Sequence, residues 1–356
     1  MITPQSLINN ILDCFETKKP DTVILGGSYA TNENAIITHD RKIFLLSDFD
    51  LLCISDEAYT NSEKIKIYEN MLKFSQNLNQ ANPYFHIGLK IRGKNELKNE
   101  IDSLYFKELS IIGKTLIGDD FLSFFNEKAK FSFTDSSNKS FLYQKLLKSA
   151  MMRIWCNILF FPIKLLNTSE VYEPLNLWYS YFISRGMMDW LTFELIENNI
   201  WKDTYSRRFE EYKKVCQQKY ILNLMKTAID IKLGKNIIDW KTIFEPIISF
   251  SLNRLTNYCQ KANTFENNYE LNFLSNMSEY VVSYMSNQKN KENILLMAKK
   301  YLEIFIKKNI DVLDKQWLLW HRLRCEYSNH KFSLNEKYKM DHFVYTNYFL
   351  HIGCLL

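Results

Sequence analysis

The apolar pattern of this chain changes near residue 138, and the change limits the folds that it can adopt. Before that point, short apolar runs of strand length alternate with helical stripes. After it, apolar residues recur at helical spacing over long segments, with almost no strand signal. The polar run 134–138 is typical of a linker. The sequence therefore predicts an α+β domain over residues 1–133 and an all-helical C-terminal domain over residues 139–356.

Composition supports this division. Of the 356 residues, 46% are hydrophobic and 24% are charged, so a sizeable core can form and disorder throughout the chain is excluded. Nine glycines and six prolines are too few for a turn-dense all-β sandwich or barrel. Aromatic residues make up 15% of the chain, a load typical of bulky helix packing.

The individual elements follow from the spacing of apolar residues. In the first domain we expect helices over 7–15, 62–79 and 97–109, strands over 23–25, 49–54, 84–91 and 115–117, and a hairpin over 35–46. In the second we expect helices over 139–160, 174–198, 204–233, 240–260, 267–286, 291–308 and 312–325.

Two short motifs of the first domain carry the chemistry. Gly26-Gly27-Ser28 closes a buried strand, and such a turn lets backbone N–H groups and the Ser28 hydroxyl approach phosphate oxygens. Asp48 and Asp50 lie at the beginning of the strand expected over 49–54, where the alternation of an extended chain places them on the same side. Adjacent carboxylates repel unless a cation lies between them, and Mg²⁺ or Mn²⁺ prefers such oxygen ligands. The motifs together predict a site for a metal-bound triphosphate.

This arrangement resembles the DNA polymerase beta-like nucleotidyltransferase superfamily. Its signature is a strand, Gly-Ser or Gly-Gly-Ser, a spacer, and Asp-hydrophobic-Asp on the next central strand; Gly27, Ser28, Asp48 and Asp50 match it residue by residue. The resemblance covers residues 20–120 and implies a nucleotidyltransferase-type mixed sheet with flanking helices. It also implies Mg²⁺-dependent transfer of a nucleoside monophosphate, with AMP from ATP expected, to a hydroxyl group with release of pyrophosphate.

Two features depart from the family pattern. The spacer 29–47 is longer than in minimal members, and the hairpin over 35–46 accounts for the excess. Many relatives also carry a third carboxylate on a later strand, but here Phe85–Ile91 contains neither Asp nor Glu. Depending on the strand register, His86 or Gly88 occupies that place. His86 is therefore the candidate general base or additional ligand, because a neutral imidazole can accept a proton or bind metal.

A basic residue of the helical domain completes the candidate site. Lys148 lies on the first helix expected there and could contact the triphosphate, although an exposed basic helix face is the simpler interpretation. We thus expect Asp48, Asp50 and His86 as catalytic residues, Gly26, Gly27, Ser28 and Lys148 as nucleotide-binding residues, and Asp48 and Asp50 as metal ligands.

Charge and cysteine usage narrow the class of partner. The formal net charge is +5, a milder excess than is typical of dedicated nucleic-acid binders, so a small-molecule or protein acceptor is favoured. The seven cysteines form no CxxC pair, as expected for reduced thiols in the cytoplasm. The N-terminus lacks a signal-peptide pattern, and the apolar stretch 154–166 is too short to span a bilayer. We expect a soluble cytoplasmic protein; its oligomeric state stays open.

Other functions are compatible with the same motifs. The chain could join nucleotides into oligonucleotide signals or modify RNA ends, although makers of oligonucleotide messengers generally keep the third carboxylate. It could also be a nucleotide-binding protein whose catalytic head has decayed. The missing acid favours this last alternative, and the intact pair of aspartates argues against it.

Overall fold

A computed structural model describes residues 5–16, 18–39, 41–78, 87–100, 104–128, 173–236, 238–239, 242–243, 246–247, 249–251 and 253–254. The chain divides into two compact units. Unit 1 consists of Met1–Leu142, Leu195–Val215 and Lys232–Asn236, and unit 2 consists of Tyr143–Glu194, Cys216–Ile231 and Ile237–Leu356. Each unit is described by itself below.

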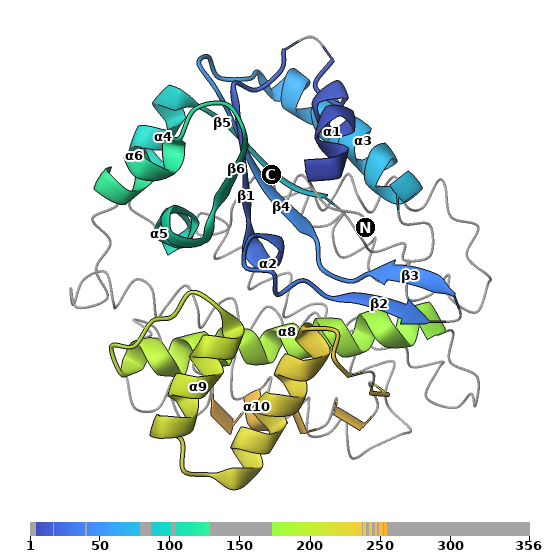
Figure 1. Ribbon diagram of the computed structural model, residues 1–356, viewed down its shortest axis with the longest axis vertical. Helices are drawn as coiled ribbons and strands as arrows, with labels where there is room; N and C mark the ends of the chain where they lie inside the picture. Colours follow the sequence, from blue (N-terminus) through green and yellow to red (C-terminus); the bar gives the residue numbers. More distant parts are fainter. Residues whose placement is uncertain are drawn as a thin grey trace, which may run out of the picture. The chain divides into compact units, whose positions relative to one another are not determined.

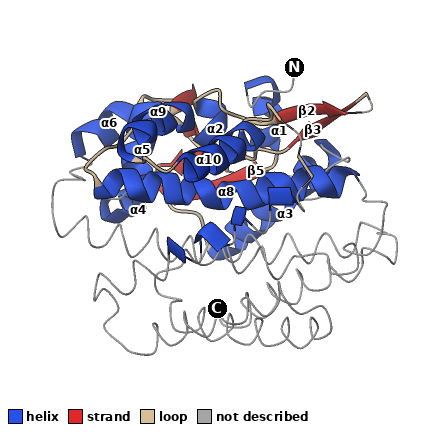
Figure 2. Ribbon diagram, turned by 90° about the horizontal axis from the view of Figure 1, so that it is seen from below, coloured by secondary structure: helices blue, strands red, loops and turns tan. Residues whose placement is uncertain are grey.

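Unit 1 contains a four-stranded mixed sheet in the order β5-β4-β1-β6. Its strands are β1 (Thr22–Gly26), β4 (Phe49–Ser55), β5 (Ile87–Gly93) and β6 (Lys114–Ile117). Strand β1 pairs antiparallel with β4 and β6, whereas β4 and β5 run parallel. A separate hairpin of β2 (Ile36–His39) and β3 (Lys42–Leu45) extends away from the sheet (Figures 1 and 2).

Helices cover both faces of this sheet (Figure 1). One side carries α1 (Ile8–Asp13), preceded by the short helix η1 (Gln5–Leu7), and α3 (Asn61–Leu78). The other side carries α4 (Lys94–Glu100), α5 (Leu104–Ile112) and α6 (Phe121–Lys128). The short helix α2 (Gly27–Ala30) directly follows β1, and α9 (Tyr205–Val215) also belongs to unit 1.

The core between the sheet and the second group of helices is aliphatic and aromatic. Its fully buried members come from β1, β4, α4, α5 and α6: Ile24, Leu52, Ile54, Leu97, Phe106, Leu109 and Phe125. Burying each such side chain contributes about 1.5–3 kcal/mol relative to leaving it exposed. The predicted α+β fold of the first region is thus confirmed for the described residues.

Local signals explain where several elements begin. The hydroxyl of Thr60 accepts a hydrogen bond from the backbone N–H of Glu63 at 3.3 Å, and the Glu63 carboxylate accepts one from the N–H of Thr60 at 2.7 Å. This reciprocal pair is a capping box, and it starts α3. The carboxylate of Glu96 similarly accepts the N–H of Gly93 at 2.7 Å where β5 passes into α4.

The elements differ from the sequence expectations in three places. The predicted helix over 97–109 is two helices, α4 and α5, and α6 was not predicted. The predicted helix over 204–233 is interrupted at 216–218, between α9 and α10 (Lys219–Lys232). Because 216–218 contains neither Gly nor Pro, apolar periodicity continues through the break and local sequence does not reveal it.

Unit 2 is helical wherever the structure describes regular structure in it. It holds α8 (Glu173–Glu197) up to Glu194 and α10 up to Ile231. Trp190 of α8 is buried and contacts Phe193 and Phe250 through edge-on ring packing. The helices expected over 139–160, 267–286, 291–308 and 312–325 lie outside the described residues, and most of 240–260 does too.

Of the helices in the described part of the chain, none combines the length and the apolar character that a bilayer span requires.

Candidate functional site

The strand register places Asp50 between two glycines. On β1 its partner is Gly26, and on β5 its partner is Gly88. Side chains of directly paired residues lie on the same face of a sheet, so the Asp50 carboxylate has no Cβ beside it on either neighbouring strand. Asp50 is exposed to solvent although the other residues of β4 are buried. The sheet therefore opens around this carboxylate.

Gly27 makes the closest approach to Asp50. Its φ is +61°, a conformation that L side chains rarely adopt. A Cβ at this position would lie 3.0 Å from Cγ of Asp50 and closer still to its Oδ2, which no side chain could tolerate without displacement. A Cβ on Gly88 would lie 2.9 Å from Oδ1 of the same carboxylate. The two predicted motifs, the glycine turn and the acidic strand, thus meet at Asp50.

The turn after β1 is held by its own backbone. The carbonyl of Gly27 accepts the N–H of Thr31 at 3.3 Å, and the carbonyl of Ser28 accepts the N–H of Glu33 at 2.8 Å. Tyr29 is buried and its ring packs edge-on against Phe49, with centroids 4.4 Å apart. Phe49 lies between the two aspartates in the sequence, so this aromatic contact ties the turn to the acidic strand.

Asp48 directly precedes β4 and is partly buried. The residue before it, Ser47, is fully buried, and its hydroxyl accepts the N–H of Ala35 at 2.8 Å. The ammonium of Lys232 also lies 3.3 Å from this hydroxyl, within hydrogen-bond distance. Lys232 is 4% exposed, so a buried cation stands one residue away from Asp48.

A second long-range contact fixes the segment after α2. The carboxylate of Glu33, 8% exposed, accepts the backbone N–H groups of Tyr205 and Ser206 at 2.6 and 2.9 Å, and the Ser206 hydroxyl at 2.6 Å. These N–H groups belong to the first turn of α9 and have no partner within the helix. Glu33 therefore caps α9 from a distant part of the chain.

Helix α9 is also anchored through an ion pair. The guanidinium of Arg208 lies 2.7 Å from the carboxylate of Glu108 on α5, and its Nε donates to the carbonyl of Lys202 at 2.7 Å. Arg208 is buried, so both contacts satisfy a charge that would otherwise be costly to desolvate. Residues 202–208 are thereby fixed to the same unit as the sheet.

The oxygen donors at this edge suit a divalent cation. Asp48 and Asp50 supply hard carboxylate oxygens, and the lack of a Cβ at Gly27 and Gly88 gives the Asp50 carboxylate the room that it occupies. Among the described residues, no group of three or more His, Cys, Asp and Glu forms a complete metal cage. Mg²⁺ is commonly bound by one or two carboxylates with substrate phosphates completing its shell. The two aspartates therefore fit Mg²⁺ as partners of a phosphate-bearing ligand.

The expected site residues have different outcomes. The structure brings Gly26, Gly27 and Asp50 together, with Ser28 in the adjoining helix α2. His86 and Lys148 lie outside the described residues, so their roles stay predictions. The position paired with Asp50 on β5 is Gly88.

Lys232, Glu33 and Arg208 were not predicted as site-supporting residues. Each is a charged residue in an amphipathic or loop segment, and its partner is distant in the sequence. Lys232 contacts Ser47, Glu33 contacts Tyr205 and Ser206, and Arg208 contacts Glu108. No local motif signals such a contact.

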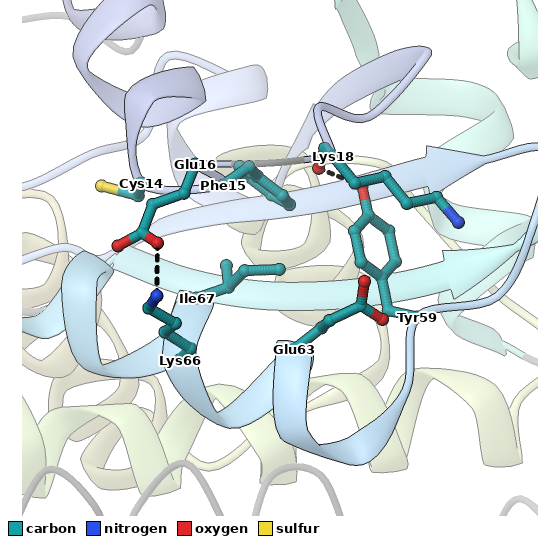
Figure 3. Close-up of a pocket in the computed structure, with 8 residues that line it drawn as sticks. All are labelled: Cys14, Phe15, Glu16, Lys18, Tyr59, Glu63, Lys66 and Ile67. Carbon is teal, nitrogen blue, oxygen red and sulfur yellow. Dashed lines mark hydrogen bonds and ion pairs between the residues drawn. The ribbon is translucent and has the colours of Figure 1, made fainter.

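A separate small cavity lies beside α1 and α3 (Figure 3). Its volume is about 40 Å³, and its lining residues are Cys14, Phe15, Glu16, Lys18, Tyr59, Glu63, Lys66 and Ile67. The carboxylates that line it have partners: Glu16 pairs with Lys66 at 2.6 Å, and Glu63 belongs to the capping box. The cavity is too small for a nucleotide, and the carboxylates of Glu16 and Glu63 are engaged in contacts that stabilise the fold.

The environment of the thiol in this cavity favours its protonated form. Burial, and secondarily the charge of Asp13, raise the pKa of Cys14 to about 11. The thiolate is the reactive form of cysteine, and the raised pKa keeps it scarce. The cavity beside α1 and α3 therefore carries no argument for a catalytic site.

Comparisons of the chain with protein-family models, with curated proteins and with solved structures each found no significant match.

Proposed function

We propose that this chain is a Mg²⁺-dependent nucleotidyltransferase that transfers a nucleoside monophosphate, with AMP from ATP expected, to a hydroxyl acceptor and releases pyrophosphate. The observation that carries the proposal is the position of the Asp50 carboxylate beside Gly27, in the space that a Cβ on Gly27 would need. It joins a glycine turn suited to phosphate with an exposed acid suited to metal. In this proposal the sheet of unit 1 is of the nucleotidyltransferase type and the C-terminal region is a helical domain.

The chain's own residues have distinct roles in this reaction. Asp48 and Asp50 would hold Mg²⁺, which supplies charge neutralisation on the triphosphate when bound. Backbone N–H groups of the Gly26–Ser28 turn and the Ser28 hydroxyl bind phosphate oxygens, because glycine permits their close approach.

The acceptor hydroxyl must lose a proton, and β5 offers no acid beside Asp50. We propose His86, which directly precedes β5, as the general base. Loss of a general base typically costs about 10²–10⁴-fold in rate. His86→Gln should reduce transfer by that factor while nucleotide affinity is retained, measured between pH 6 and 9. Nearly full turnover across this range would assign the base to another residue.

The proposal also covers the classes of donor and acceptor. We propose a nucleoside triphosphate as donor and a small molecule or protein side chain as acceptor, because the net charge of +5 is mild for a nucleic-acid partner. The proposed location is the cytoplasm, where the reduced cysteines would be stable.

The direct test is incubation of purified protein with α-labelled nucleoside triphosphates, Mg²⁺ and a panel of hydroxyl-bearing acceptors. Acceptor-dependent pyrophosphate release and label transfer support the proposal. Labelled oligonucleotides formed without an acceptor would instead identify a messenger-forming enzyme. Absence of nucleotide binding to the wild-type protein would contradict the proposal.

A second candidate is a nucleotide-binding protein without turnover. It is favoured by Gly88, since this position paired with Asp50 carries no third carboxylate. In that case the wild-type protein binds Mg²⁺–ATP but transfers nothing to any acceptor. Asp50→Asn then abolishes Mg²⁺–ATP binding and has no transfer activity to reduce.

A further inference from the structure

We infer that Lys232 is a positioning residue for the metal-binding aspartates: its buried ammonium holds Ser47 and thereby fixes the adjacent Asp48. The inference rests on the function proposed above. It concerns a residue at the end of α10, distant in sequence from the motifs of the site.

The first observation is the burial of the ammonium. Lysine is rarely fully buried, because desolvating its charge is costly unless polar partners compensate. Lys232 is 4% exposed, and its Nζ lies 3.3 Å from the Ser47 hydroxyl. The ring of Tyr205 adds a cation–π contact at 5.8 Å. The surroundings of Lys232 are therefore adapted to a cation.

The second observation is what Ser47 does. Its hydroxyl accepts the Ala35 N–H, and its own N–H donates to the Ala35 carbonyl at 3.4 Å. Ser47 thus closes the base of the long spacer that separates the glycine turn from the acidic strand. Ser47 is bonded to Asp48, so a displacement of Ser47 moves the Asp48 backbone with it.

The third observation is that other contacts hold the same base. Gly234, with φ +66°, lies beside Ala35, and a Cβ on it would be in van der Waals contact with the Ala35 Cα at 3.4 Å. Glu33, two residues before Ala35, caps α9 through Tyr205 and Ser206. Residues 205–206 and 232–234 therefore contact both sides of the base of the spacer, at Glu33 and Ala35 on one side and at Ser47 on the other.

The physical consequence is preorganisation of the metal site. Two neighbouring carboxylates resist convergence without a cation, so the chain must hold them near each other before metal arrives. A buried, hydrogen-bonded ammonium supplies such a restraint at Ser47, and hydrogen bonds to charged groups are stronger than neutral ones. Removing the ammonium should loosen residues 33–50 and weaken binding of the metal nucleotide by about tenfold.

The test compares four variants with the wild-type protein. Lys232→Met keeps an unbranched apolar stem and removes the charge, Lys232→Arg keeps a cation, and Ser47→Ala removes the acceptor. Lys226→Met is the control, because Lys226 lies on the same helix, is more than half exposed and pairs with Asp230. Circular dichroism verifies that each variant is folded.

Two measurements are made on each folded variant. Hydrogen exchange of the metal-free protein is followed in peptides covering 33–50, with 61–78 in α3 as the internal reference. Affinity for Mn²⁺ with a non-hydrolysable ATP analogue is measured by electron paramagnetic resonance.

We expect Lys232→Met and Ser47→Ala to accelerate exchange over 33–50 alone and to weaken Mn²⁺–nucleotide binding. Lys232→Arg should recover part of both effects, and Lys226→Met should match the wild type. If Lys232→Met does not fold, Lys232→Arg and Ser47→Ala decide the question.

Two results for Lys232→Met would overturn the inference. One is hydrogen exchange over 33–50 at the wild-type rate. The other is faster exchange over 33–50 with unchanged affinity for the Mn²⁺–nucleotide. If the wild-type protein binds no Mn²⁺–nucleotide while Lys232→Met still exchanges faster over 33–50, the proposed function fails instead. The exchange measurement, which requires no ligand, therefore separates the two failures.

Discussion

The two ends of β4 have opposite chemistry. At its beginning, Asp50 is exposed and has glycine as its partner on both neighbouring strands. Just after its end, the charged residues Asp56 and Glu57 pair with Lys94 and Lys18, respectively. At the beginning of β4, the acid Asp50 lies between two glycines. Just after the end of β4, the acids Asp56 and Glu57 each pair with a lysine.

The two ends of β4 differ in whether their polar groups stabilise the fold or cost stability. The closed end uses polar groups for folding: the Tyr59 hydroxyl donates to the Lys18 carbonyl at 3.0 Å, and Asp21 accepts the N–H of Asp56 at 2.7 Å. The open end carries the features that cost stability, namely a glycine at positive φ and a desolvated lysine. Such costs are typical of functional sites.

The largest expected effect removes the acid of the open end. Asp50→Asn should lower nucleotide transfer by more than about 100-fold, since even outer-shell partners of a metal cost about 10–100-fold. The free energy of unfolding should change by less than about 0.5 kcal/mol, because Asp50 is exposed. Transfer kinetics and urea unfolding measure the two quantities. Wild-type turnover in the Asp48→Asn, Asp50→Asn double variant would contradict the proposed site.

The second prediction compares substitutions of two glycines, one near each end of β4. Gly27 and Gly118 both have positive φ, +61° and +82°, and a Cβ on Gly118 would press on the Asp21 backbone. Replacement of either by Ala should lower the free energy of unfolding by about 1–3 kcal/mol. Gly27→Ala should also weaken triphosphate binding, whereas Gly118→Ala should not. Equal nucleotide affinity in the two variants would show that phosphate does not bind at the Gly27 turn.

The smallest expected effect concerns Cys14, in the cavity beside α1 and α3. Burial raises its pKa, so above the unfolded-state pKa the unfolded chain loses this proton while the folded chain keeps it. The folded state then binds more protons than the unfolded state, and stability falls as pH rises from about 9 to 11. Cys14→Ala should reduce this fall, as urea unfolding at several pH values would reveal. An unchanged pH dependence in the variant would contradict the assignment.

Much of the fold of unit 1 could be predicted because its signals are local. The apolar run before Gly26 and the hairpin around residues 39–42 are short-range patterns, and the structure confirms both elements. The division of 97–109 into α4 and α5, and the break at 216–218, could not be predicted. Apolar periodicity continues across such breaks, and packing decides where a helix actually ends.

The candidate site likewise has features that local sequence indicates and features that depend on packing. The residues of the proposed site, the Gly26–Ser28 turn and the pair Asp48 and Asp50, could be nominated from the sequence, because each motif consists of residues adjacent in the chain. The pairing of Gly88 with Asp50 and the contact of Lys232 with Ser47 became known from the folded structure. Strand register and the burial of a distant lysine depend on packing among segments far apart in the chain, and no local pattern encodes them.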